Sequence, residues 1–337
     1  MIQPEPGPII GPISTFFGII LDFLYNIVYA ITPGELHTLG ISIVLFTLVS
    51  KTLTFPLTHK SQKSMQAMQK LQPEMEKIKK KYENSKSPED QKKMGQEISK
   101  LYSENKVSPL MGCLPMFIKF PIFMSMFHIM NQPYRFVTRL GEIYSSLADT
   151  IIASFNPDAA GIFQNPEGIV TLTQLAYGKV PQGMEISVLV PEELRRLLAR
   201  LSPYEWDIFM NSITPDAAAQ IQPYLDSKMA TEYFIGITLV ENVSFSFPAI
   251  LIPVLCVIFT FLTSYLTTKN QPKPTEPTQK VQQKMMLFMM PAMMGFITFG
   301  MPAGVGVYWV TSSALQIIQQ YVTGKRAKAR EAAGAVS

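Results

Sequence analysis

The residues best placed to do chemistry are two lysines inside long apolar stretches. Lys51 lies within 36–57 and Lys119 within 108–130, and each is the only Lys or Arg of a stretch that has no Asp or Glu. An ionisable side chain at the centre of a bilayer costs at least about 2.5 kcal/mol, so it marks a candidate functional site. A lysine can also extend along its own stem to the headgroups. The sequence leaves both interpretations open for each lysine.

Polar residues recur at steps of three and four in three apolar stretches, a spacing that places each set on one face of a helix. Converging polar faces with a cation among them predict a hydrated cavity between helices. The alternative is that the hydroxyls bond to their own backbone or to a neighbouring helix. The three sets are Thr47, Lys51, Thr54 and Thr58; Thr260, Thr263, Ser264 and Thr267; and Trp309, Ser313, Gln316 and Gln320.

The stretch 284–300 carries soft apolar residues in place of a polar face. Methionine adapts to varied apolar partners, so these side chains predict an apolar contact surface. They are Met285, Met286, Met289, Met290, Met293 and Met294.

The elements that must position these side chains are apolar stretches long enough to cross a bilayer. There are five, at 36–57, 108–130, 245–267, 284–300 and 303–322, and Pro302 predicts a tight return between the last two. Membrane helices tolerate internal prolines, because neighbouring helices satisfy the backbone groups that a proline leaves unpaired. We therefore predict an all-α membrane protein with a five-span helical bundle. Buried helices of a soluble enzyme are the alternative, but they would need flanking amphipathic elements.

A sixth apolar stretch, at 9–31, has a different character. Ser14, Gly18, Asp22 and Asn26 form a polar stripe, which favours an amphipathic helix lying in the membrane interface. No Lys or Arg precedes it, so it does not resemble a signal peptide. A sixth span is the alternative.

Basic residues predict the orientation, because cytoplasmic loops carry an excess of Lys and Arg. Twelve Lys fall in 58–107, four basic residues in 269–284 and four in the tail 323–337, whereas 1–35 has none and 131–244 has 13 acidic residues against seven basic ones. We expect an extracytoplasmic N-terminus with the interfacial helix (1–35), a cytoplasmic helical hairpin (58–107), a mostly helical extracytoplasmic insert (131–244), a cytoplasmic linker (268–283) and a cytoplasmic tail (323–337). Cys113 and Cys256 fall inside spans, so no disulfide is expected.

The segments outside the apolar stretches have features of helices but few candidate functional residues. In 58–107, apolar residues at steps of three and four predict a paired-helix seam, and Ser87-Pro88 predicts a helix start. The Lys run at 77–81 suits anionic headgroups; without interleaved aromatic residues it does not predict specific nucleic-acid binding. In the insert we expect helices at 134–154, 191–201 and 215–228 and loops over 156–190.

No motif for a metal, cofactor or catalytic triad occurs, and we predict neither a cofactor nor an enzyme. His37, His59 and His128 have no partner carboxylates at catalytic spacing.

Several motifs resemble the YidC/Oxa/Alb family of membrane-protein insertases. The run 109–115 (PLMGCLP) resembles the family's NP-x-x-GCLP at the start of the second span, and 302–309 (PAGVGVYW) resembles its PAG-x-x-x-YW signature. Gln283-Lys284-Met285 with Met290-Pro291 and the run 317–320 (IIQQ) are also similar. Lys51 stands where the family usually has Arg, and Lys119 and Thr263 stand where Gln is common.

The resemblance implies insertion of nascent membrane proteins without ATP or a continuous pore. The chain would be a short bacterial form without the large N-terminal periplasmic domain, in the plasma membrane. A hydrophilic groove, open to cytosol and lipid, would receive polar tails, and substrate helices would slide along the methionines. Partners would be nascent chains, their ribosomes and anionic lipids, with or without a Sec translocon. The competing hypothesis is a small-molecule carrier or channel subunit, which the lack of an inverted repeat and of intramembrane carboxylates disfavours. We predict these groove and slide residues: Lys51, Thr47, Thr54, Lys119, Thr260, Thr263, Trp309, Ser313 and Gln316; Met286, Met289, Met290 and Met293.

Overall fold

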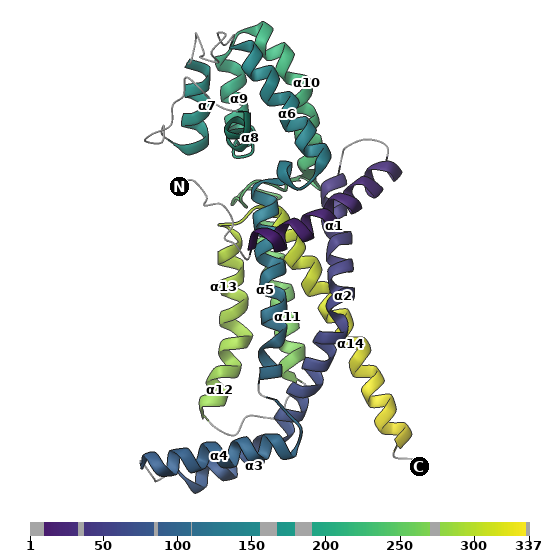
Figure 1. The fold of residues 1–337 in the computed structure, drawn as a ribbon, viewed down its shortest axis with the longest axis vertical. Helices are drawn as coiled ribbons and strands as arrows, with labels where there is room; N and C mark the ends of the chain where they lie inside the picture. Colours follow the sequence, from purple (N-terminus) through teal and green to yellow (C-terminus); the bar gives the residue numbers. More distant parts are fainter. Residues whose placement is uncertain are drawn as a thin grey trace. The chain divides into compact units, whose positions relative to one another are not determined.

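The computed structural model is almost entirely helical, which confirms the all-α prediction (Figure 1). It describes residues 10–32, 37–83, 87–108, 110–155, 167–178, 191–269 and 277–334. The elements are α1 (Ile10–Ile31), α2 (Thr38–Lys70), α3 (Gln72–Lys81), α4 (Pro88–Glu104), α5 (Leu110–Asn131), η1 (Pro133–Arg135), α6 (Thr138–Ser154), α7 (Glu167–Tyr177), α8 (Pro191–Leu198), α9 (Pro203–Ser212), α10 (Pro215–Glu232), β1 (Tyr233–Phe234), β2 (Ile237–Thr238), α11 (Leu251–Lys269), α12 (Pro277–Lys284), η3 (Met285–Met289), α13 (Met290–Thr298) and α14 (Ala303–Gly334).

Three of the described helices are long and apolar enough to cross a membrane: α1, the Thr38–Ser64 part of α2, and α11. Met285–Thr298 is a shorter apolar helix. The stretches predicted as spans at 108–130 and 303–322 are also helical, in α5 and α14. Helices of this kind are typical of a membrane protein, and the count of five spans stays a prediction. The predicted tight return at Pro302 is confirmed, because α13 ends at Thr298 and α14 begins at Ala303.

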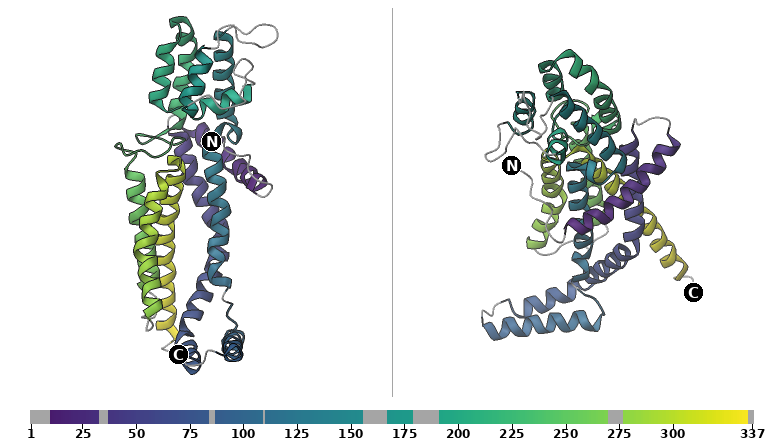
Figure 2. Two further views of the ribbon diagram at one scale, coloured as in Figure 1. Left: turned by 90° about the vertical axis from the view of Figure 1, so that its left-hand side faces the viewer. Right: turned by 45° about the horizontal axis from the view of Figure 1, so that its top comes forward.

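The chain divides into two compact units. The first contains residues 1–47, 122–257 and 293–312, and the second contains 48–121, 258–292 and 313–337. Within the first unit, α6 to α10 form a helical group (Figure 2) that corresponds to the predicted insert.

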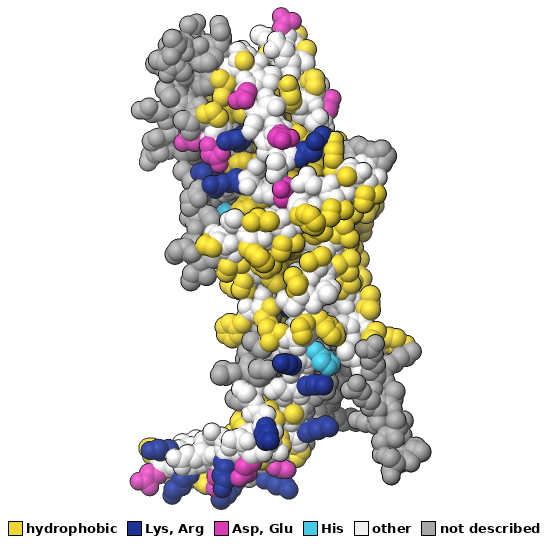
Figure 3. All heavy atoms as spheres, turned by 45° about the vertical axis from the view of Figure 1, so that its right-hand side comes forward, with side chains coloured by type: hydrophobic (Ala, Val, Ile, Leu, Met, Phe, Trp, Pro, Cys, Tyr) yellow, Lys and Arg dark blue, Asp and Glu magenta, His cyan; other side chains and the backbone are white. Residues whose placement is uncertain are grey.

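In the first unit, part of the polar stripe of α1 faces the protein, whereas Asn26 is exposed. Ser14 is fully buried, and the Asp22 carboxylate accepts hydrogen bonds from Thr138 N at 2.8 Å and Thr138 Oγ1 at 2.9 Å. Phe16 and Phe23 lie on the exposed face, which belongs to a broad apolar surface (Figure 3). A helix with its apolar face outward suits contact with lipid. The interfacial placement of α1 and its alternative, a sixth span, both stay predictions.

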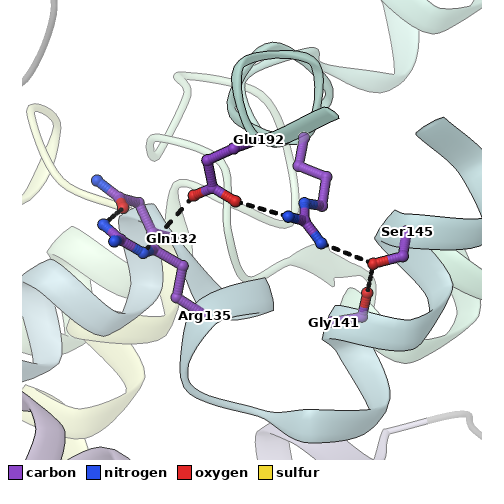
Figure 4. A network of polar contacts seen from close by, with 6 residues as sticks. Gln132, Arg135, Gly141, Ser145 and Glu192 are labelled. Carbon is purple, nitrogen blue, oxygen red and sulfur yellow. Dashed lines mark hydrogen bonds and ion pairs between the residues drawn. The ribbon is translucent and has the colours of Figure 1, made fainter. Parts of the chain in front are cut away.

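A polar network joins the helices of the insert. Arg195 of α8 donates to Ser145 Oγ of α6 at 2.8 Å and to Glu192 Oε2 at 2.8 Å. The other Glu192 oxygen lies 3.7 Å from Arg135 Nε (Figure 4). This network fixes the start of α8 against η1 and α6.

A buried ion pair lies between α6 and α10. Lys228 and Glu232 have side chains that are 1% and 0% exposed, and Lys228 Nζ lies 2.8 Å from Glu232 Oε2. Tyr144 donates to the other Glu232 oxygen at 2.5 Å. Burial, followed by the charge of Glu232, raises the pKa of Tyr144. Burial also raises the pKa of Glu241 to about 7, although the Lys228 charge acts in the opposite direction.

The prediction of loops over 156–190 is wrong for residues 167–177, which form α7. Ile169 and Leu172 of α7 are fully buried, and α7 packs against α8 and α9. The helix is therefore stabilised by tertiary burial that its flanking Gly, Pro and Asn residues do not reveal. The helix α9 was not predicted. The other residues of 156–190, apart from Gly178, lie outside the described part.

In the second unit, the predicted helical hairpin is formed by α3 and α4. The predicted helix start at Ser87-Pro88 is confirmed, since α4 begins at Pro88. Tyr102 of α4 donates to Met75 Sδ of α3 at 2.8 Å, as expected for facing seams. An exposed pair, Lys81 Nζ to Glu97 Oε1 at 2.7 Å, also links the two helices.

Gly40 of α2 lets the ring of Phe234 approach the helix. A Cβ at position 40 would lie 2.1 Å from Phe234 Cδ2, so we expect Gly40→Ala to lower the free energy of unfolding by about 1 to 3 kcal/mol through overpacking. Gly95→Ala in α4 is the matched control, because a Cβ there meets nothing within 4 Å, and helix propensity should stabilise it by up to about 1 kcal/mol. Thermal unfolding in detergent measures both. Equal midpoints for the two variants would contradict the prediction.

Candidate functional site

The site is centred on Lys119, which α5 contributes to the second unit. Its Nζ donates a hydrogen bond to Gln316 Oε1 of α14 at 2.6 Å. The ammonium is thus directed toward a neighbouring helix. The acceptor is a neutral amide, and no Asp or Glu occurs in 110–121, 258–269 or 313–322. The positive charge of Lys119 is therefore not neutralised from these segments.

Lys51 of α2 adds a second positive charge in the same unit. Its side chain is only partly exposed, and it belongs to the same compact unit as Lys119. Two like charges in one partly buried region raise the local positive potential. An acidic ligand group would be attracted to such a potential.

The threonines predicted beside these lysines bond mainly to their own helices. Thr54 Oγ1 donates to Ser50 O at 2.8 Å, and Thr263 Oγ1 donates to Phe259 O at 2.7 Å. Each hydroxyl oxygen keeps acceptor capacity after donating. Thr260 and Ser313 lie in the same unit and are partly exposed. The polar faces are therefore partly satisfied from within, as the alternative interpretation expected.

A second inter-helix contact lies farther along α14. Gln320 Nε2 donates to Thr267 Oγ1 of α11 at 3.1 Å. Within the described residues, two buried amide atoms of α14 have no hydrogen-bond partner: Gln320 Oε1 and Gln319 Nε2. Buried polar atoms are normally satisfied by protein or water. These two atoms are therefore unsatisfied polar groups near the cytoplasmic end predicted for this helix.

The remaining two predicted groove residues belong to the first unit. Thr47 is fully buried, and its hydroxyl donates to Ile43 O at 2.7 Å. Trp309 packs edge-on against Phe123 of α5, with ring centroids 5.4 Å apart. Lys51 and Lys119 belong to the second unit. A position of Thr47 and Trp309 beside these lysines therefore stays a prediction.

The methionines predicted as an apolar slide lie largely on the surface. In the second unit, Met289 and Met290 are exposed and Met286 is partly exposed. Met293 is exposed in the first unit. Met285–Met289 forms a π-helical turn shortly before Pro291, and such turns are frequent at functional sites.

Sequence reasoning did not find the Gln320–Thr267 contact or the unsatisfied Gln319 amide. Both glutamines are polar residues near the end of a predicted span, and they follow Gln316 by three and four residues, the spacing of one helix face. The sequence does not predict which helix packs against these glutamines.

The Lys119–Gln316 bond gives a testable contribution to stability. Gln316→Leu should lower the free energy of unfolding by about 1.5 to 3 kcal/mol, because a hydrogen bond to a charged group is lost. Added to Lys119→Met, the same change should cost much less, which a double-mutant cycle detects. Ser313→Ala, one turn earlier on the same helix, is the matched control. Full additivity of the two substitutions would show that the contact contributes nothing.

The chain is similar in sequence to known proteins over most of its length. The family model described as "60Kd inner membrane protein" matches residues 31–174 and 206–330. A protein of Fusobacterium nucleatum named "Membrane protein insertase YidC" is 26% identical over 313 residues, covering 91% of this chain and 99% of the relative. One of the same name from Oceanobacillus iheyensis is 25% identical over 293 residues, covering 87% and 77%.

Some relatives of that name are much longer than the part they share with this chain. The one from Syntrophobacter fumaroxidans is 40% identical over 112 residues, which cover 33% of this chain and 18% of the relative. The family model, by contrast, extends over most of the chain and includes both segments that carry Lys51 and Lys119. The chain therefore belongs to the 60Kd inner membrane protein family, that of the YidC/Oxa insertases.

Proposed function

We propose that this protein inserts nascent membrane proteins into the bilayer, using the second-unit cluster around Lys51 and Lys119 as part of a hydrophilic groove. The observation that carries the proposal is the Lys119–Gln316 bond. This bond holds the Lys119 cation of an apolar helix against the neutral amide of Gln316. Relatives of the chain are named as membrane protein insertases. A cation held this way remains available to an anionic ligand.

A hydrated groove lowers the cost of bringing a polar tail into the membrane, because burying unpaired polar groups in hydrocarbon is expensive. The lysines attract acidic residues of that tail. In the proposed orientation, the membrane potential then favours outward movement of negative charge by about 2.3 kcal/mol per charge per 100 mV.

The apolar helix of the substrate follows a different route. Exposed methionines at 289, 290 and 293 provide flexible apolar contacts that accept side chains of varied shape. We propose that substrate helices move along this surface into lipid.

The proposed topology has five spans, with the N-terminus outside and the basic tail in the cytoplasm of a bacterium. The lysine-rich α3–α4 hairpin then faces anionic headgroups, whose attraction is about 1 kcal/mol per basic residue near the surface. Ribosome–nascent chain complexes deliver the substrates, with or without a Sec translocon.

Site-specific photocrosslinking tests the proposal. A probe at Lys51 or at Thr263 should crosslink to ribosome-stalled nascent chains whose polar tail is short. The same probe at Tyr204, on the exposed face of α9, is the control and should give no such product. Crosslinks that appear only at Tyr204 would refute the groove.

A further inference from the structure

A short hairpin in the first unit has an unusual residue at its turn. Strands β1 and β2 pair antiparallel, with Phe234 opposite Ile237. The two residues between them, Ile235 and Gly236, have φ values of 48° and 84°. A two-residue turn with both φ values positive strongly prefers Asn, Asp or Gly. A β-branched isoleucine is strained there, so the turn is not optimised for local stability.

The hairpin is held from two sides, so its tip has a defined position. The backbone N–H of Ile235 donates to His37 Nδ1 at 3.4 Å, and the His37 ring lies 6.0 Å from that of Tyr233. On the other side, a Cβ on Gly236 would lie 2.8 Å from Pro248 Cγ. The hairpin thus lies against the loop that leads into α11.

The side chains at this place are apolar and exposed. Ile235 is 69% exposed, and Phe245 and Phe247 of the neighbouring loop are each 80% exposed. Phe245 also stacks on Phe299, with ring centroids 4.2 Å apart, which fixes its orientation. We call Ile235, Phe245 and Phe247 the tip patch. The segment that carries it projects sideways before α11 begins (Figure 2, left).

We propose that the tip patch inserts into the lipid at the membrane boundary and anchors the first unit there. The occupant of the patch is lipid, at the level where acyl chains meet headgroups. This role is separate from the groove and does not depend on substrate insertion.

Three observations favour lipid over a protein partner. The patch is continuous along the chain with the exposed apolar side chains of the first turns of α11, Leu251, Val254 and Leu255, and α11 is long and apolar enough to cross a membrane. Between residues 233 and 268 the only charged residue is Glu241, whereas protein-binding surfaces usually have a polar rim. Phenylalanine is also typical of the apolar faces that interfacial helices bury at the boundary between headgroups and acyl chains.

Depth measurements with spin labels test the proposal. The full chain, with Cys113→Ala and Cys256→Ala, carries one label through Ile235→Cys or Phe247→Cys in vesicles of phosphatidylethanolamine and phosphatidylglycerol. We expect both labels to be relaxed more by oxygen than by a water-soluble nickel chelate. A label through Tyr224→Cys, on the exposed face of α10, is the control and should show the reverse. Nickel accessibility at 235 and 247 equal to that at 224 would overturn the proposal, as would low accessibility to both reagents.

Ile235→Asn provides an independent test, because asparagine suits the turn conformation. If Ile235 is present for lipid contact, the substitution should leave the thermal midpoint in detergent unchanged or raise it. A midpoint several degrees lower would mean that Ile235 packs within the protein, and the proposal would be wrong.

Discussion

Replacing Lys228 by methionine should lower the free energy of unfolding by about 3 to 5 kcal/mol, the usual cost of leaving one partner of a buried ion pair uncompensated. Both side chains of the Lys228–Glu232 pair are almost completely buried. Among the described residues, the Glu232 carboxylate would keep only the hydrogen bond from Tyr144, which cannot balance a full negative charge. The thermal midpoint of the purified protein in detergent measures the effect.

Two further variants separate the loss of charge from the loss of packing. Lys228→Met combined with Glu232→Gln removes the buried charge while an amide oxygen can still accept from Tyr144, so we expect most of the stability to return. Lys81→Met breaks the Lys81–Glu97 pair, which has a similarly short distance of 2.7 Å but side chains that are 61% and 36% exposed. Solvent screens such a pair, so its loss should hardly move the midpoint. A similar fall for Lys81→Met and Lys228→Met would show that burial is not the cause.

The buried pair also shows where sequence reasoning reached its limit. Lys228 and Glu232 are four residues apart, and so are Lys100 and Glu104, whose charged groups lie 3.8 Å apart on the surface of α4. One spacing therefore occurs in two opposite environments. Only the packing of α6 on α10 distinguishes them, and that packing is a tertiary property.

Candidate site residues within the apolar helices were easier to predict from the sequence. Since Lys and Gln are rare in such helices, each stood out from its apolar neighbours in the sequence, and the structure joins Lys119 to Gln316. The partner of Lys119 could not be predicted, because spacing along one helix does not determine which helix packs against it. The helix α7 was missed for a related reason, because its stability comes from Ile169 and Leu172 in the core of the insert.

Replacing Lys51 by glutamine should reduce the insertion of substrates with acidic N-terminal tails by about tenfold. A tenfold change corresponds to about 1.4 kcal/mol, well below the roughly 4 kcal/mol that two unit charges gain at 4 Å in an environment of intermediate dielectric. The smaller value is appropriate because acidic residues lose hydration on entering the groove and because Lys119 remains. Protease protection of the translocated tail in reconstituted vesicles gives the inserted fraction.

Three comparisons make this result specific to charge. Lys51→Arg should insert acidic tails nearly as well as the parent protein, because it keeps the positive charge. Substrates with neutral tails should be unaffected by Lys51→Gln, and Thr54→Val, one turn away on α2, should leave acidic tails unaffected. Removing both cations with Lys51→Gln and Lys119→Gln should reduce insertion further, since the two ammonium groups act on the same tail. If Lys51→Gln inserted acidic tails at the parent rate while the double variant failed, the attraction would belong to Lys119, which Gln316 holds in place.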